Sequence, residues 1–105
     1  MRIPRKRAIG QQGSWFAKVD GEALPCVHKR FLTRLAYHDP AKGVPLPKDY
    51  VRAIEKGTVV LTKSSEVERG RFERSGYVAI FRIADFDFND GQVRFSLAQR
   101  LADLT

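Results

Sequence analysis

The sequence predicts an α+β domain built around a small, bent-sheet β-barrel of about five strands with one or two short helices. Two Asp-Gly pairs, Asp20-Gly21 and Asp90-Gly91, lie between apolar stretches and predict tight β-hairpins, because a type I′ turn needs positive φ at both central positions. A one-sided apolar stripe that ends at Gly57 predicts a helix. The phase of the apolar residues changes near Arg82, which predicts a bulge and hence a curved sheet.

The length and composition fit one folded domain. The 105 residues suffice for a single core, and 43% hydrophobic with 30% charged residues is typical of a globular chain. We expect a mobile basic N-terminal arm over residues 1–12 and one domain over residues 13–105. The only cysteine, Cys26, cannot form an internal disulfide, and no apolar run is long enough to cross a membrane. Residues 1–9 lack the apolar core of a secretory signal, so we expect a cytoplasmic protein.

The first Asp-Gly turn sets the register of its two strands. With Val19 opposite Glu22, Ala17 pairs with Leu24 and Trp15 with Cys26 on one face, which we expect to be the core. Phe16 and Lys18 lie on the other face, where Phe16 pairs with Pro25. Since proline cannot donate to a ladder, the second strand is expected at a sheet edge or at a bulge.

The pattern in the middle of the chain predicts a short helical turn, a loop, a helix, a buried strand and a polar segment. Phe31, Leu32 and Leu35 have a short helical spacing that His38-Asp39-Pro40 breaks, and residues 39–47 are expected to form a loop. After Pro47, a stripe of Tyr50, Val51 and Ile54 predicts the clear helix. Thr58 to Lys63 is rich in β-branched residues and predicts a buried strand. Residues 64–76 are polar and predict an exposed loop or a loosely paired hairpin extension.

The second Asp-Gly turn predicts the other hairpin. With Asn89 opposite Gln92, the expected pairs on one face are Phe88 with Val93, Phe86 with Phe95, and Ala84 with Leu97. The opposite face pairs Asp87 with Arg94. An apolar ladder and a charge pair therefore follow from one register, which favours this alignment.

The charge of the chain is unevenly placed. The formal net charge is +7, and residues 1–34 hold eight basic and two acidic side chains, whereas residues 83–105 hold two basic and four acidic ones. A directional positive field of this kind attracts phosphate backbones, although a basic surface can also serve solubility alone.

Aromatic and basic residues interleave near the N-terminus, and nucleic-acid modules need both cations for phosphates and rings for base stacking. Phe16 and Lys18 share one face, and the alternative for Phe16 is that the helix over residues 48–56 covers it. The residues expected to contact phosphates are Arg2, Arg5, Lys6, Arg7, Lys29, Arg30 and Arg34.

Several segments resemble the PUA-like barrel superfamily, which includes the EVE and ASCH domains. They are DYVRAIEKGTVVLTKSS, GYVAIFRIADFDF, QVRFSLAQRLADL and the N-terminal GSWFAKVD. The resemblance implies a concave pocket for a modified or flipped base, or for an RNA stem, with pocket candidates Trp15, Lys18, Lys63, Ser64 and Ser65. The chain departs from the family where its first strand enters an Asp-Gly hairpin followed by Pro-Cys-Val-His.

Other chemistry has less support, and no catalytic residue, metal or cofactor is expected. Cys26, His28, His38 and Asp39 match no zinc spacing, and Asp85 with Asp87 is explained more simply by the Arg94 pair. The sequence therefore predicts a module that binds RNA or modified DNA. A small hydrolase or nuclease using His28, His38 or the two aspartates is one alternative, and a protein-interaction domain with an exposed edge at Pro25 to Lys29 is another.

Overall fold

The computed structural model describes residues 3–10, 15–40, 45–69 and 71–104, and only the backbone for residues 64–67 and 71–75. The predicted α+β class is confirmed, since the described chain is mostly strands with one α-helix. The elements are β1 (Arg5–Lys6), β2 (Phe16–Val19), β3 (Glu22–His28), the 3₁₀ turn η1 (Lys29–Phe31), β4 (Leu32–Thr33), β5 (Ala36–Asp39), α1 (Lys48–Glu55), β6 (Thr58–Glu68), β7 (Arg71–Asn89) and β8 (Gln92–Leu104).

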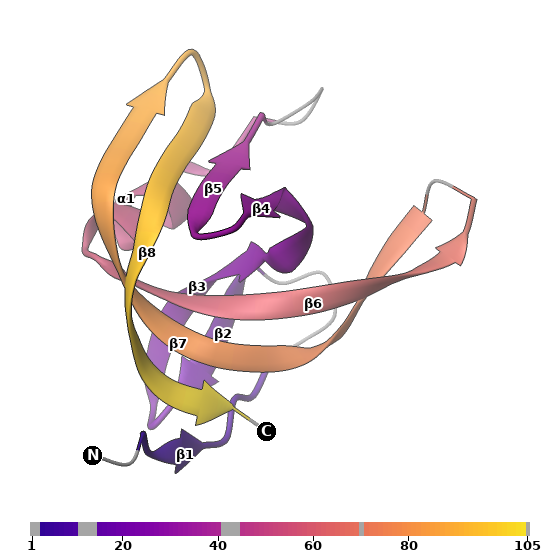
Figure 1. Ribbon diagram of the computed structural model, residues 1–105, viewed down its shortest axis with the longest axis vertical. Coiled ribbons are helices and arrows are strands. Elements are labelled where there is room, and N and C mark those ends of the chain that lie inside the picture. Colours follow the sequence, from indigo (N-terminus) through magenta and orange to yellow (C-terminus); the bar gives the residue numbers. More distant parts are fainter. Residues whose placement is uncertain (1–2, 11–14, 41–44, 70, 105) are drawn as a thin grey trace.

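The strands form one mixed sheet that differs from the expected barrel of about five strands (Figure 1). Its order is β2-β3-β6-β7-β8-β5-β4, with β1 paired to β8 outside this path. The β3–β6 and β1–β8 pairs are parallel and the others are antiparallel. Along this path the sheet does not close on itself. In the part of the chain that the structure describes, no helix is long and apolar enough to cross a membrane.

The first hairpin has the predicted register. Val19 is opposite Glu22, and the pairing continues to Phe16 with Pro25. Asp20 and Gly21 have φ of 53° and 78°, as a type I′ turn requires. The expected sheet edge at Pro25 is wrong, because β3 pairs with β6 from Cys26 onward. Proline is tolerated since Cys26 is the first residue of that parallel pairing, so no ladder bond is lost at Pro25.

Apolar residues occur on both faces of the sheet because each face covers a separate core cluster. In β6, Val59 and Leu61 belong to one cluster and Val60 to the other, and all three are buried. In β2, Phe16 packs against the first cluster while Ala17 and Val19 are buried in the second. The first cluster also holds α1 and the hairpin end of β8, and the second holds the opposite end of β8. A sheet covered on both faces reads as continuous hydrophobic runs, as Thr58 to Lys63 does.

The strands β7 and β8 are long and curved, so each reaches both clusters (Figure 1). The predicted irregularity near Arg82 is confirmed by a register shift between Arg82 and Ile83. At the Asp90-Gly91 turn, the pairs Asn89–Gln92, Phe88–Val93 and Asp87–Arg94 are as predicted.

Beyond these pairs the predicted register is wrong, since Ala84 pairs with Ser96 rather than Leu97 and Phe86 does not pair with Phe95. The cause is a bulge at Asp85, whose φ is 56°.

The helical stripe is confirmed in α1, where Tyr50, Val51 and Ile54 are buried and Gly57 follows with φ of 108°. The second helical segment is only one 3₁₀ turn, η1, and residues 32–39 form the β4–β5 hairpin instead. Tyr37 in β5 is buried and stacks on Phe95 of β8 at 4.5 Å between ring centroids. This non-local strand pairing overrides the short helical spacing of the sequence. Of the two alternatives for residues 64–76, the paired extension is confirmed, since residues 64–66 and 68 of β6 pair with residues 71–74 of β7.

The N-terminal segment expected to be a mobile arm lies against the sheet over its described residues. Arg5 and Lys6 form β1 and pair with Asp103 and Leu104 of β8. Ile9 exchanges two backbone hydrogen bonds with Lys18 of β2, at 2.9 and 2.7 Å. Ala8, between them, is buried in the second cluster. Residues 5–9 therefore run from β8 to β2.

Candidate nucleic-acid interface

Aromatic and basic side chains lie where β3 ends and η1 begins, and Trp15 lies beside β3, where its carbonyl oxygen accepts from the Cys26 amide. We call this surface the aromatic–basic patch and define it by Trp15, His28, Lys29, Arg30, Phe31 and Lys63. The strand pairing builds it, because His28 lies opposite Thr62 in the parallel β3–β6 ladder and each is followed by an exposed lysine. The short η1 then turns the chain back, so that Arg30 lies over the Phe31 ring at 4.7 Å.

The rings of the patch form two series, each of which ends on a buried tyrosine. His28 and Phe31 meet edge to face at 6.3 Å, and Phe31 meets Tyr37 in the same way at 5.8 Å. On the other side, the Trp15 ring lies 4.7 Å from that of Tyr50. These contacts fix the outer rings on a buried base of Tyr37 and Tyr50, each of which is 2% exposed.

Trp15 does not lie in the core, contrary to the prediction, because 37% of its surface is exposed. The hairpin pairing ends beside it with the bond from the Cys26 amide to the Trp15 carbonyl oxygen at 2.9 Å. Its ring then packs on Tyr50 of α1 instead of entering the second cluster. Phe16 follows the alternative in which the helix covers it, since it is partly buried and meets the Tyr50 ring edge to face at 6.2 Å.

Beneath the rings lies a group of buried polar atoms. The Tyr50 hydroxyl donates to the Cys26 carbonyl oxygen at 2.5 Å, and the Thr62 hydroxyl donates to the Val27 carbonyl oxygen at 3.2 Å. Thr62 Oγ1 also lies 3.3 Å from His28 Nδ1. The Tyr37 hydroxyl lies near Tyr50 and the His28 backbone but makes no hydrogen bond of ordinary geometry among the described residues. Burial raises the pKa of both tyrosines, so both hydroxyls remain protonated at neutral pH.

The two tyrosine hydroxyls are expected to affect stability in opposite ways. Tyr50→Phe leaves the buried Cys26 carbonyl without its donor and should lower the free energy of unfolding by about 1–2 kcal/mol. Tyr37→Phe removes a buried hydroxyl that makes no hydrogen bond of ordinary geometry with the described residues, so it should be neutral or slightly stabilising. Urea unfolding of both variants measures the difference, and an equal loss in the two would contradict this account.

The basic residues predicted to contact nucleic acid fall into two groups that lie on different elements. Arg5 in β1 and Arg7 directly after it are exposed, and Lys18 is exposed on β2. Lys6 is ion-paired with Asp20 at 2.7 Å. Lys29, Arg30 and Lys63 are exposed in the patch, and Arg34 is exposed in the β4–β5 turn with φ of 60°. Arg2 lies outside the described residues, and for Ser64 and Ser65 the structure describes only the backbone within β6.

The residues of the alternative catalytic readings are not brought together. His38 Nε2 lies 2.7 Å from Gln92 Oε1 on β8, whereas His28 Nδ1 lies 3.3 Å from Thr62 Oγ1 on β6. Asp85 lies in the bulge and Asp87 pairs with Arg94, while Cys26 is buried. Among the described residues, no group of three or more His, Cys, Asp or Glu side chains could hold a metal ion. The edge expected at Pro25 to Lys29 is occupied by β6 from Cys26 to His28.

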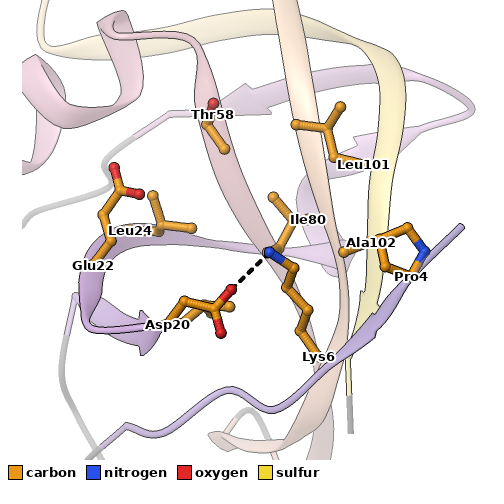
Figure 2. Close-up of a pocket in the computed structure, with 10 residues that line it drawn as sticks. Pro4, Lys6, Asp20, Glu22, Leu24, Thr58, Ile80, Leu101 and Ala102 are labelled. Carbon is orange, nitrogen blue, oxygen red and sulfur yellow. Dashed lines mark hydrogen bonds and ion pairs between the residues drawn. The ribbon is translucent and has the colours of Figure 1, made fainter.

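Sequence reasoning missed the part of the site that supports the exposed rings. Tyr50 was expected only on the apolar stripe of the helix and Thr62 only within the buried strand, while Tyr37 was not singled out. Their meeting depends on pairings between distant segments. A pocket of about 240 Å³ also lies beside β1 and the first hairpin turn, and Trp15 does not line it (Figure 2).

In comparisons with known proteins, no family model, no curated protein and no solved structure matches this chain.

Proposed function

We propose that this protein is a cytoplasmic nucleic-acid-binding module that contacts RNA or modified DNA through the aromatic–basic patch. The observation that carries the proposal is a partly exposed tryptophan that packs on Tyr50 beside β3, together with three exposed cations, Lys29 and Arg30 after the end of β3 and Lys63 on the neighbouring β6. Bases stack on exposed rings at roughly 1–3 kcal/mol each, and cations bind the phosphates between them. The net charge of +7 adds long-range attraction.

The proposal includes a PUA-like barrel as the scaffold. Residues 5–9 pair with β8 at one end and with β2 at the other, which are the positions a barrel-closing segment would occupy. The second core cluster, with Val60, Ile80 and Leu104, would then be the barrel interior. In this arrangement Arg5 and Arg7 form a second phosphate contact next to the closing segment.

The test is binding of short single-stranded RNA and DNA, unmodified and base-modified, across a salt series. Trp15 is the only tryptophan, so quenching of its emission reports stacking directly. We expect the triple variant Lys29→Gln, Arg30→Gln, Lys63→Gln to bind at least about tenfold more weakly. The slope of log K against log salt should become less negative by about 2, since each phosphate contact on a single strand contributes about −0.7.

A matched variant, Arg52→Gln, Lys56→Gln, Arg82→Gln, removes the same charge from exposed positions outside the patch. It should retain most of the affinity, because the net field changes equally but the patch is intact. If both triple variants weaken binding to the same extent, the attraction is unspecific and the proposed interface is wrong. Millimolar affinity that is insensitive to salt would reject nucleic-acid binding itself.

A further inference from the structure

A pocket lies between the N-terminal segment and the β2–β3 turn, away from the aromatic–basic patch. Its volume is about 240 Å³, below the roughly 300–1,000 Å³ of sites for drug-sized ligands, so it would accept only a small molecule. Four strands supply its floor with apolar side chains, namely Val19, Leu24, Ile80 and Ala102, all buried. Figure 2 shows Leu24, Ile80 and Ala102 with the charged side chains of Lys6, Asp20 and Glu22 around the pocket.

The rim of this pocket carries three charged groups. Lys6 Nζ and Asp20 Oδ2 form an ion pair at 2.7 Å, and Figure 2 draws this pair across the opening. Glu22 also lines the pocket, and its carboxylate is drawn apart from that pair. Since Lys6 neutralises Asp20, Glu22 gives the rim a net negative charge in a chain whose formal net charge is +7.

The placement of these groups follows from local geometry. Asp20 occupies the first central position of the hairpin turn, and Glu22 begins β3 directly after the turn. Lys6 lines the pocket from β1, which the pairing of Arg5 and Lys6 with β8 holds in place. The two carboxylates and the apolar floor are thus set by backbone pairing and not by flexible loops.

We infer that this pocket binds a small amphipathic ammonium ligand, with its apolar body on the floor of Val19, Leu24 and Ile80 and its charged head on Glu22. Ligand sites of this kind combine a mostly apolar lining with few polar groups that orient the ligand. The Lys6–Asp20 pair remains intact in this arrangement, so binding breaks no internal ion pair. The inference does not rest on the aromatic–basic patch, because none of the patch residues lines the pocket.

The test uses three ligands of nearly equal shape: 3-methylbutylamine, 3-methylbutan-1-ol and 3-methylbutanoate. Amide chemical shifts of Glu22, Thr58 and Ala102 are followed at about 0.15 M salt, where charges distant from the pocket are screened. We expect the amine to bind with a Kd of about 1 mM, the alcohol at least threefold more weakly, and the carboxylate most weakly. Equal binding of amine and alcohol, preference for the carboxylate, or absence of saturable shifts up to 50-fold above that Kd would each overturn the inference.

Two variants of pocket residues and one control variant locate the ligand. Glu22→Gln should weaken binding of the amine about three- to tenfold and leave binding of the alcohol unchanged. Glu55→Gln, at an exposed position of α1, should change the binding of neither ligand. Thr58→Leu adds volume at a half-buried pocket position and should weaken both ligands. Loss of amine binding in Glu55→Gln, or full binding in Thr58→Leu with an unchanged melting temperature, would place the ligand elsewhere and refute the assignment.

Discussion

Phe95→Ala is expected to lower the free energy of unfolding by about 3–5 kcal/mol, a large part of the roughly 5–15 kcal/mol that stabilises a typical domain. Phe95 is 3% exposed and stacks on Tyr37 at 4.5 Å, so its loss leaves a cavity at the centre of the first core cluster. It also removes the ring on which Tyr37 stacks, and Tyr37 supports the aromatic–basic patch, whereas the backbone pairing of β5 with β8 does not depend on this side chain. Urea unfolding followed by circular dichroism measures the change.

Phe88→Ala is the matched control for this prediction. Phe88 belongs to the same hairpin and was expected in the same apolar ladder, but 45% of its surface is exposed near the turn. Its replacement should cost no more than about 1 kcal/mol, since little area is buried there. Equal losses in the two variants would indicate that the two rings are buried alike, as the sequence alone suggested.

Deletion of residues 1–9 is expected to lower the free energy of unfolding by about 2–4 kcal/mol. The deletion removes the β1–β8 pairing, the bond from the Asp103 amide to the Pro4 carbonyl oxygen at 2.8 Å, and both bonds between Ile9 and Lys18. Each such bond contributes about 0.5–1.5 kcal/mol net, and Ala8 is withdrawn from the second cluster. Thermal and urea unfolding of the full and shortened chains give the difference.

Lys6→Gln measures the contribution of the Lys6–Asp20 ion pair separately from that of the whole N-terminal segment. The Lys6 and Asp20 side chains are 38% and 68% exposed, so breaking their pair should cost less than about 1 kcal/mol. A deletion that costs no more than this single change would show that the segment behaves as the mobile arm expected from the sequence. A much larger loss in the deletion supports its role in joining β8 to β2.

The sequence was most informative where one local signal determines one local conformation. Asp20-Gly21 and Asp90-Gly91 each carry the positive φ that their turns need, so the pairs nearest to each turn were predicted correctly. The stripe of Tyr50, Val51 and Ile54 likewise predicted α1. The predicted register of the second hairpin fails at Ala84 and Ile83, because an extra residue in the bulge at Asp85 moves these pairs by one and nothing in the alternating pattern marks it.

The sequence named the basic residues of the candidate site but did not predict how its aromatic rings pack. Lys29, Arg30 and Lys63 were named from composition and resemblance, and all three are exposed. The exposure of Trp15 and the support from Tyr37 and Tyr50 were missed, because they depend on where α1 and β5 pack. A local pattern states which face of an element is apolar but not which distant element will cover it.

By itself, the sequence determined the turns, the helix, the buried central strand and an excess of positive charge, since each depends on neighbouring residues or on composition. Only the tertiary structure decided that β3 and β6 run parallel, that residues 5–9 join β8 to β2, and that residues 32–39 are strands. Those outcomes depend on burying both faces of one sheet at once, and that requirement acts between segments far apart in the chain.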